Sequence, residues 1–103
     1  MKEVLDSENN KYEIRSEGDV IVIGGGEQWL AEIGTRITEM LNHSKEGDRT
    51  TQALLRGEEL RPGGAYAVYI LRGKLYVDTR NARGDVNARE EIRRVVDLVL
   101  TQV

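Results

Sequence analysis

One stretch of the sequence constrains the fold more than any other: an apolar run that ends in three glycines and continues into a helical pattern. Residues 19–23 read Asp-Val-Ile-Val-Ile, whereas apolar residues after the glycines recur at three- and four-residue spacing. β-Branched residues favour strands, and the later spacing forms one face of a helix. The stretch therefore predicts a strand, a sharp turn at Gly24–Gly26 and a helix over 27–43.

The glycine turn resembles the opening of flavin- and nicotinamide-binding Rossmann domains, whose first strand ends in G-x-G-x-x-G. Gly24 and Gly26 match the first two glycines, but Trp29 stands at the third position, where the helix must pass close to the strand. Glu27 adds a negative charge at the first turn, where a phosphate would sit. We expect a structural hinge here, with Gly24, Gly25 and Gly26 as the candidate anion- or nucleotide-binding site.

The residues before the glycines predict a three-stranded antiparallel meander. The apolar positions are Val4 and Leu5 in one strand and Tyr12 and Ile14 in the next, and Ser7–Asn10 between them suits a tight turn. Glu17–Gly18 predicts the second turn. The strand over 19–23 lacks polar alternation, which predicts a central strand covered on both faces or covered by a dimer partner.

The residues after the glycines predict two helices. The long helix over 27–43 carries Gly34 on its apolar stripe, where glycine costs roughly 1 kcal/mol relative to alanine. Close approach of the sheet is a physical reason for a glycine at that position. A short helix is predicted over 50–56, with Gly57 as its stop signal.

The last third of the chain predicts a hairpin and a helix. Strands are expected over 65–71 and 75–79, with Gly73–Lys74 as a type II′ turn pair. The final helix is expected over 87–103 with Asn87 as N-cap, although β-branched residues leave a strand alternative for 95–103.

The element order is βββα(α)ββα, which predicts the α+β class: a single antiparallel sheet with two main helices packed on one face. At 103 residues we expect a single domain over 1–103. This order is similar to that of small dimeric type III secretion chaperones and of roadblock-type modules. Both begin with a helix that is not predicted here.

The residue inventory offers little for catalysis. The chain has no cysteine and one histidine, His43, beside Ser44 at the end of the long helix, where sequence neighbours do not face each other. We therefore expect no catalytic residue, no metal site and no cofactor, and favour a non-enzymatic role. Asp78, in an apolar strand, is the best candidate for a perturbed carboxyl, and the simplest outcome is an exposed face with a pair between Asp78 and Arg80 or a charge pair across the strands.

Charge is unevenly spread along the chain. Residues 1–60 carry 7 basic and 13 acidic side chains, and residues 61–103 carry 8 basic and 5 acidic. Internal pairing is the simplest expectation. Head-to-tail association with a copy and binding of a charged partner by one face are the alternatives. The overall acidity argues against nucleic acid, and no apolar run approaches the ~20 residues that span a membrane. Together with the lack of cysteine, this favours a cytoplasmic location.

The strand over 65–71 is apolar on both faces, so we expect one face to meet a copy of the chain or another protein. The predicted interface consists of Tyr66, Val68, Tyr69, Ile70 and Tyr76. The leading hypothesis is a non-catalytic protein-binding domain, regulatory or inhibitory, that forms a homodimer. The alternatives are an anion- or nucleotide-binding domain that uses the glycine turn, and nucleic-acid binding through the basic C-terminal half.

Overall fold

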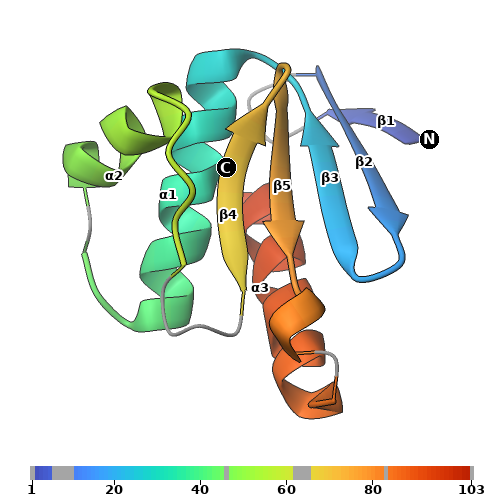
Figure 1. Ribbon diagram of the computed structural model, residues 1–103. Helices are drawn as coiled ribbons and strands as arrows, with labels where there is room; N and C mark the ends of the chain where they lie inside the picture. The colour runs from blue at the N-terminus through green and yellow to red at the C-terminus, as the bar shows by residue number, and fades with distance from the viewer. Residues whose placement is uncertain (1, 6–10, 46, 62–65, 83, 103) are drawn as a thin grey trace.

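Five antiparallel strands form one sheet, and the α-helices lie on one of its faces (Figure 1). The computed structural model describes residues 2–5, 11–45, 47–61, 66–82 and 84–102. The elements are β1 (Lys2–Leu5), β2 (Lys11–Glu17), β3 (Val20–Gly24), α1 (Glu27–Asn42), α2 (Gly47–Leu55), β4 (Ala67–Leu71), β5 (Lys74–Asp78), the 3-10 helix η2 (Arg80–Ala82) and α3 (Val86–Gln102). This arrangement confirms the predicted α+β class.

The strand order across the sheet is β1-β2-β3-β5-β4, so β3 is the middle strand, as its apolar sequence predicts. β5 crosses over to pair with β3, with Ile21 opposite Val77 and Ile23 opposite Leu75. The N-terminal meander and the C-terminal hairpin therefore form one continuous sheet. The helices cover only one face of β3.

The β4–β5 hairpin is present as predicted, but its turn differs. Its two central residues are Arg72 and Gly73, with φ values of 52° and 77°. Two positive φ angles define a type I′ turn, whose twist matches that of the flanking strands. The predicted type II′ turn with Gly73–Lys74 is therefore wrong, because Lys74 already pairs with Leu71 as the first residue of β5. The predicted Ser7–Asn10 turn lies outside the described residues.

The stop signal at Gly57 is confirmed by the end of α2. Gly57 adopts a φ of 83°. Its N–H donates to the Leu54 carbonyl (3.0 Å), and the Glu58 N–H donates to the Ala53 carbonyl (3.1 Å). These two bonds are the Schellman motif that a glycine after a helix permits. The helix itself begins at Gly47, earlier than predicted.

The start of α3 corrects the predicted cap. The carboxylate of Asp85 accepts a hydrogen bond from the Ala88 N–H (3.0 Å), and the helix begins at Val86. Asp85 is therefore the N-cap, and Asn87 lies inside the first turn. The helix continues to Gln102, so the strand alternative for the last residues is wrong over 95–102.

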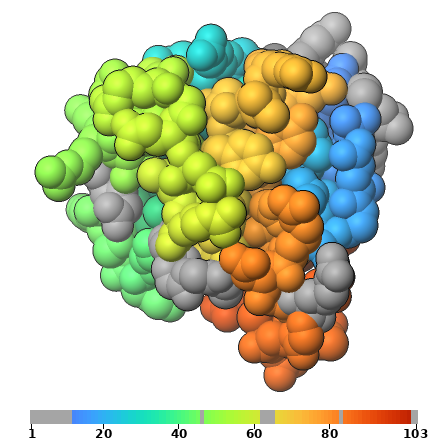
Figure 2. Space-filling view, viewed as in Figure 1, coloured from blue at the N-terminus to red at the C-terminus, as the bar shows by residue number. Residues whose placement is uncertain are grey.

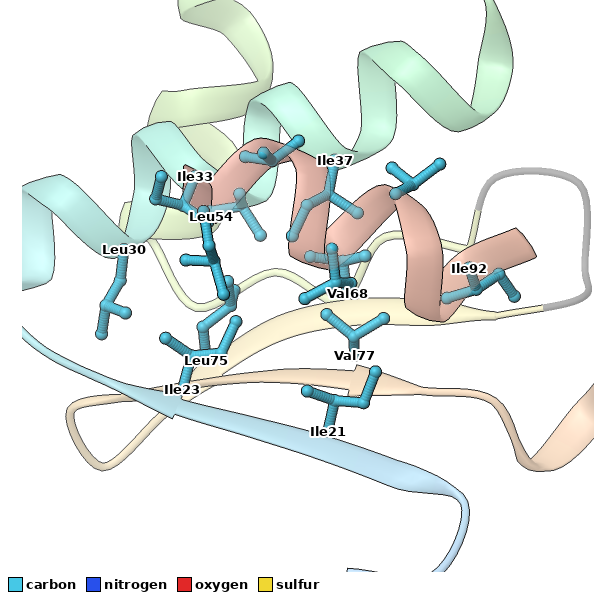
Figure 3. Packing of buried hydrophobic residues seen from close by; sticks show 14 of the residues in the cluster. Ile21, Ile23, Leu30, Ile33, Ile37, Leu54, Val68, Leu75, Val77 and Ile92 are labelled. Carbon is cyan, nitrogen blue, oxygen red and sulfur yellow. The ribbon is translucent and has the colours of Figure 1, made fainter. Parts of the chain in front are cut away.

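The core lies between the sheet and the helices. Figure 3 shows side chains of β3, β4 and β5 directed at side chains of the three α-helices. The residues labelled there are Ile21, Ile23, Leu30, Ile33, Ile37, Leu54, Val68, Leu75, Val77 and Ile92, each no more than 4% exposed. A Cβ on Gly34 would lie 2.7 Å from Leu54 Cδ1 and 3.2 Å from Leu75 Cδ1. The predicted close approach at Gly34 is confirmed, and α2 comes even closer than the sheet does.

Candidate functional site: the open face of the sheet

None of the α-helices in the described part of the chain covers the second face of the sheet, and we call this surface the open face (Figure 1). Because side chains alternate along a strand, every second residue of each strand belongs to it. The register of β2, β3, β5 and β4 assigns to the open face Glu13, Arg15, Glu17, Val20, Val22, Gly24, Lys74, Tyr76, Asp78, Ala67, Tyr69 and Leu71. Figure 2 views the molecule from this side.

Two tyrosines occupy the centre of the exposed surface of β4 and β5. Tyr69 and Tyr76 are cross-strand partners, and their rings stack with centroids 5.1 Å apart and planes 9° from parallel. Val22, the β3 residue that pairs with Tyr76, is only 2% exposed, because the side chains of Tyr76 and Arg15 flank it on the neighbouring strands. The stacked tyrosine rings and the packed side chains beside them therefore form a rigid, partly apolar surface.

Asp78 lies beside this pair and is locked to Arg80. Its carboxylate, 6% exposed, accepts hydrogen bonds from Arg80 Nη2 (2.6 Å), from Arg80 Nε (2.9 Å) and from the Arg80 backbone N–H (3.0 Å). These bonds from Arg80 hold the pKa of Asp78 below its ordinary value, against the opposing effect of burial. The predicted pair is confirmed, and it makes Asp78 a structural anion that positions Arg80.

Further ion pairs border the tyrosines. Arg15 contacts Glu17 on β2 (3.0 Å), and Arg61 contacts Glu59 (3.0 Å). The segment that carries Glu59 and Arg61 runs along the outer edge of β4, where Leu60 and Val68 exchange two backbone hydrogen bonds of 2.8 Å. Most charges around the tyrosines are thus balanced within the face.

The phenol of Tyr69 stays neutral in this surrounding. Burial raises the pKa of Tyr69, and the nearby negative charge of Asp78 raises it further. Tyr69 therefore adds no charge to the open face at physiological pH.

The predicted interface residues divide between two sides of the sheet. Tyr66 and Val68 lie in the core, 4% and 0% exposed, and Ile70 packs against it. Only Tyr69 and Tyr76 are on the open face. The period of two along β4 separates them, since alternate residues must point to opposite faces.

The glycine turn contributes to the open face through one residue. Gly24 is the last residue of β3 and lies between Glu13 and Lys74 on the neighbouring strands. Gly26 caps α1 with extended backbone (φ −64°, ψ 141°) and without a side-chain hydrogen bond. The structure thus brings Gly24 onto the face that carries Tyr76, while Gly26 belongs to the helix start.

Trp29 explains why the turn departs from the nucleotide-binding pattern. Its indole stacks on the ring of Tyr12 from β2, with centroids 5.3 Å apart. A phosphate-binding turn has a small residue at this position. Here the position holds an indole ring, which packs α1 against the sheet.

Several open-face residues were missed by sequence reasoning. The alternation of Glu13, Arg15 and Glu17 with Tyr12 and Ile14 contains the necessary signal, because it marks β2 as having one polar face. Glu59 and Arg61 carry no such signal, since they lie outside any regular strand and reach the face through the Leu60 bridge.

A groove of about 310 Å³ lies elsewhere, between the first turns of α3 and the sheet, and Ile21, Thr79 and Arg93 are among its lining residues. Arg89 in this groove already contacts Asp19 at 2.7 Å. Among the described residues, no three His, Cys, Asp or Glu side chains group as metal ligands would. Nor does any helix in the described part of the chain have the length and apolarity needed to cross a membrane.

Comparison with known proteins yields no match: no protein-family model, curated protein or solved structure is significantly similar to this chain.

Proposed function

We propose that this chain is a non-catalytic protein-binding domain and that the open face is its binding surface. The observation that carries the proposal is the stacked Tyr69–Tyr76 pair at the centre of a helix-free sheet face, bordered by arginines. Tyrosine and arginine are enriched where protein interfaces are energetically strongest, and a polar rim around an aromatic centre is the usual interface anatomy.

The surface is also well ordered for binding. Stacking fixes each tyrosine ring against the other, and Asp78 fixes the guanidinium of Arg80 through several hydrogen bonds. Side chains that are already immobilised lose less conformational entropy on association. We infer a regulatory or inhibitory role in the cytoplasm, exerted by covering a surface of another chain.

A second candidate is single-stranded nucleic acid. Tyrosines next to Arg72 and Lys74 could stack bases and contact phosphates. Against this, the two rings already stack on each other, and Arg15, Arg61 and Arg80 are each paired with an acid. Affinity for a labelled oligonucleotide that falls steeply with salt supports this alternative, and no binding at low ionic strength contradicts it.

A third candidate is an anion at the glycine turn. The Gly26 cap leaves the first backbone N–H groups of α1 without a side-chain partner, and Glu27 opposes a bound anion electrostatically. Titration with phosphate and nucleotides distinguishes the outcomes. Amide shifts confined to residues 23–28 support an anion site, and no shift at millimolar ligand contradicts it.

Affinity capture tests the leading proposal. Tagged wild-type protein, the double variant Tyr69→Ser/Tyr76→Ser and the control Leu98→Ser, which alters an exposed residue of α3, are exposed to extract of the cells that make the protein. We expect the wild type and the control to retain the same partner and the double variant to lose it. Equal capture by all three proteins contradicts the proposal, and circular dichroism verifies that each variant is folded.

A further inference from the structure

We propose that the partner on the open face is a second copy of this chain, packed face to face about a two-fold axis that runs along β3. This inference rests on the proposed function, because it names the occupant of the same surface.

The residues that β3 contributes to the open face are compatible with a two-fold axis along this strand. On the open face β3 carries Val20, Val22 and Gly24, none of which is charged. Val22 is 2% exposed between Arg15 and Tyr76, so Val20 and Gly24 are the residues that can reach the axis. A residue on a two-fold axis meets its own copy, so a charge there would meet a like charge. Gly24 leaves a cavity of about 10 Å³ whose lining includes Glu13, Arg15 and Lys74. A glycine at this point lets a second backbone approach closely.

In the row of Gly24 the flanking strands are complementary in charge. Glu13 on β2 and Lys74 on β5 are the neighbours of Gly24 on its two sides. A rotation about β3 exchanges the sides, so Glu13 of one protomer lies over Lys74 of the other. The contact occurs twice in the dimer, as in every isologous interface.

The next row supports the same arrangement. Arg15 and Tyr76 flank Val22, so the rotation places the guanidinium of each Arg15 over the ring of Tyr76 in the other protomer. A guanidinium over an aromatic ring is attractive. In the last row, Glu17 of one protomer approaches Asp78 of the other, whose charge Arg80 already balances.

Charge reversal with sedimentation velocity tests the inference. The proteins are wild type, Glu13→Lys, Lys74→Glu, an equimolar mixture of these two variants, and the control Glu32→Lys on exposed helix α1. We expect dimers for the wild type and the control. Each single variant places like charges together twice, so we expect its dimer to weaken by about tenfold or more. The mixture restores both opposite-charge contacts and is expected to form dimers again.

Three results overturn the inference: a wild type that stays at 11.6 kDa at millimolar concentration, a dimer that both reversals leave intact, or a mixture that does not recover. The affinity-capture experiment distinguishes a failure of the dimer proposal from a failure of the proposed protein-binding function. If pure protein is monomeric while capture still depends on Tyr69 and Tyr76, the open face binds a different protein. If neither occurs, both proposals are wrong.

Discussion

At the scale of single residues, Asp78 links the fold to the proposed surface. The carboxylate is buried, yet it is ionised because Arg80 donates to it from both its side chain and its backbone. The alternation of Tyr76, Asp78 and Arg80 along one strand made this pair one of two expectations, and a charge pair across the strands was the other. The burial of Asp78 was not predictable, because it depends on what β3 and β4 place beside it.

Asp78→Asn is expected to destabilise the protein by roughly 1.5–3 kcal/mol at neutral pH, the usual contribution of hydrogen bonds to a charged group. The folded pKa of Asp78 lies below its ordinary value of 3.8. The stabilisation is therefore complete above about pH 4 and is lost as the pH falls through the folded pKa. Urea unfolding at a series of pH values should show the two proteins converging in acid. A constant gap down to pH 2 contradicts this account.

His43 ends α1 in the left-handed conformation, with a φ of 54°. Side chains with a Cβ are strained there and glycine is not, so His43→Gly is expected to stabilise the protein by up to about 1 kcal/mol. His43→Val, which is β-branched, is expected to destabilise it. Chemical unfolding of the three proteins checks the order, and a less stable glycine variant contradicts the assigned strain.

At the scale of elements, periodicity predicted the helices and strands well, whereas caps and turns required the structure. The spacing of Leu30, Ile33 and Ile37 alone indicates α1. In contrast, Asp85 and Asn87 are equally good caps by residue type, and only the observed hydrogen bond from the Ala88 N–H to Asp85 decides between them. The difference arises because periodicity is a local property, while an N-cap depends on where the chain enters the helix.

The two candidate caps can be separated by substitution. Asp85→Ala removes the acceptor of the Ala88 N–H and is expected to cost about 1 kcal/mol of stability. Asn87→Ala, in the exposed first turn, is expected to be neutral or slightly stabilising, since alanine is the better helix former. Thermal unfolding of both variants measures the difference. A larger loss for Asn87→Ala contradicts the observed cap.

Gly34 lies where α1, α2 and the sheet come together. Alanine favours helices, but its Cβ would lie 2.7 Å from Leu54, so Gly34→Ala is expected to destabilise the protein by about 1–3 kcal/mol. Leu54→Val shortens the obstructing side chain and should cost less in the Gly34→Ala background than in the wild type. Additive losses in this double-mutant cycle contradict a direct clash.

At the scale of the whole molecule, the class and order of the elements followed from the sequence, but the functional surface did not. Strand 65–71 is apolar on both faces, and sequence alone could not say which face the helices cover. The structure buries Tyr66 and Val68 and leaves Tyr69 beside Tyr76. That choice depends on α1 and α2, which pack on the side of β4 that carries Val68.

The most direct test of the open face is site-specific photo-crosslinking in living cells. A photoreactive amino acid replaces Tyr76 on the open face or, as the control, Arg94, which is exposed on α3. We predict adducts from position 76 and none from position 94, with an adduct of twice the 11.6 kDa chain mass if the partner is a second copy. No adduct from position 76, or equal adducts from both positions, would contradict the open face as the binding surface.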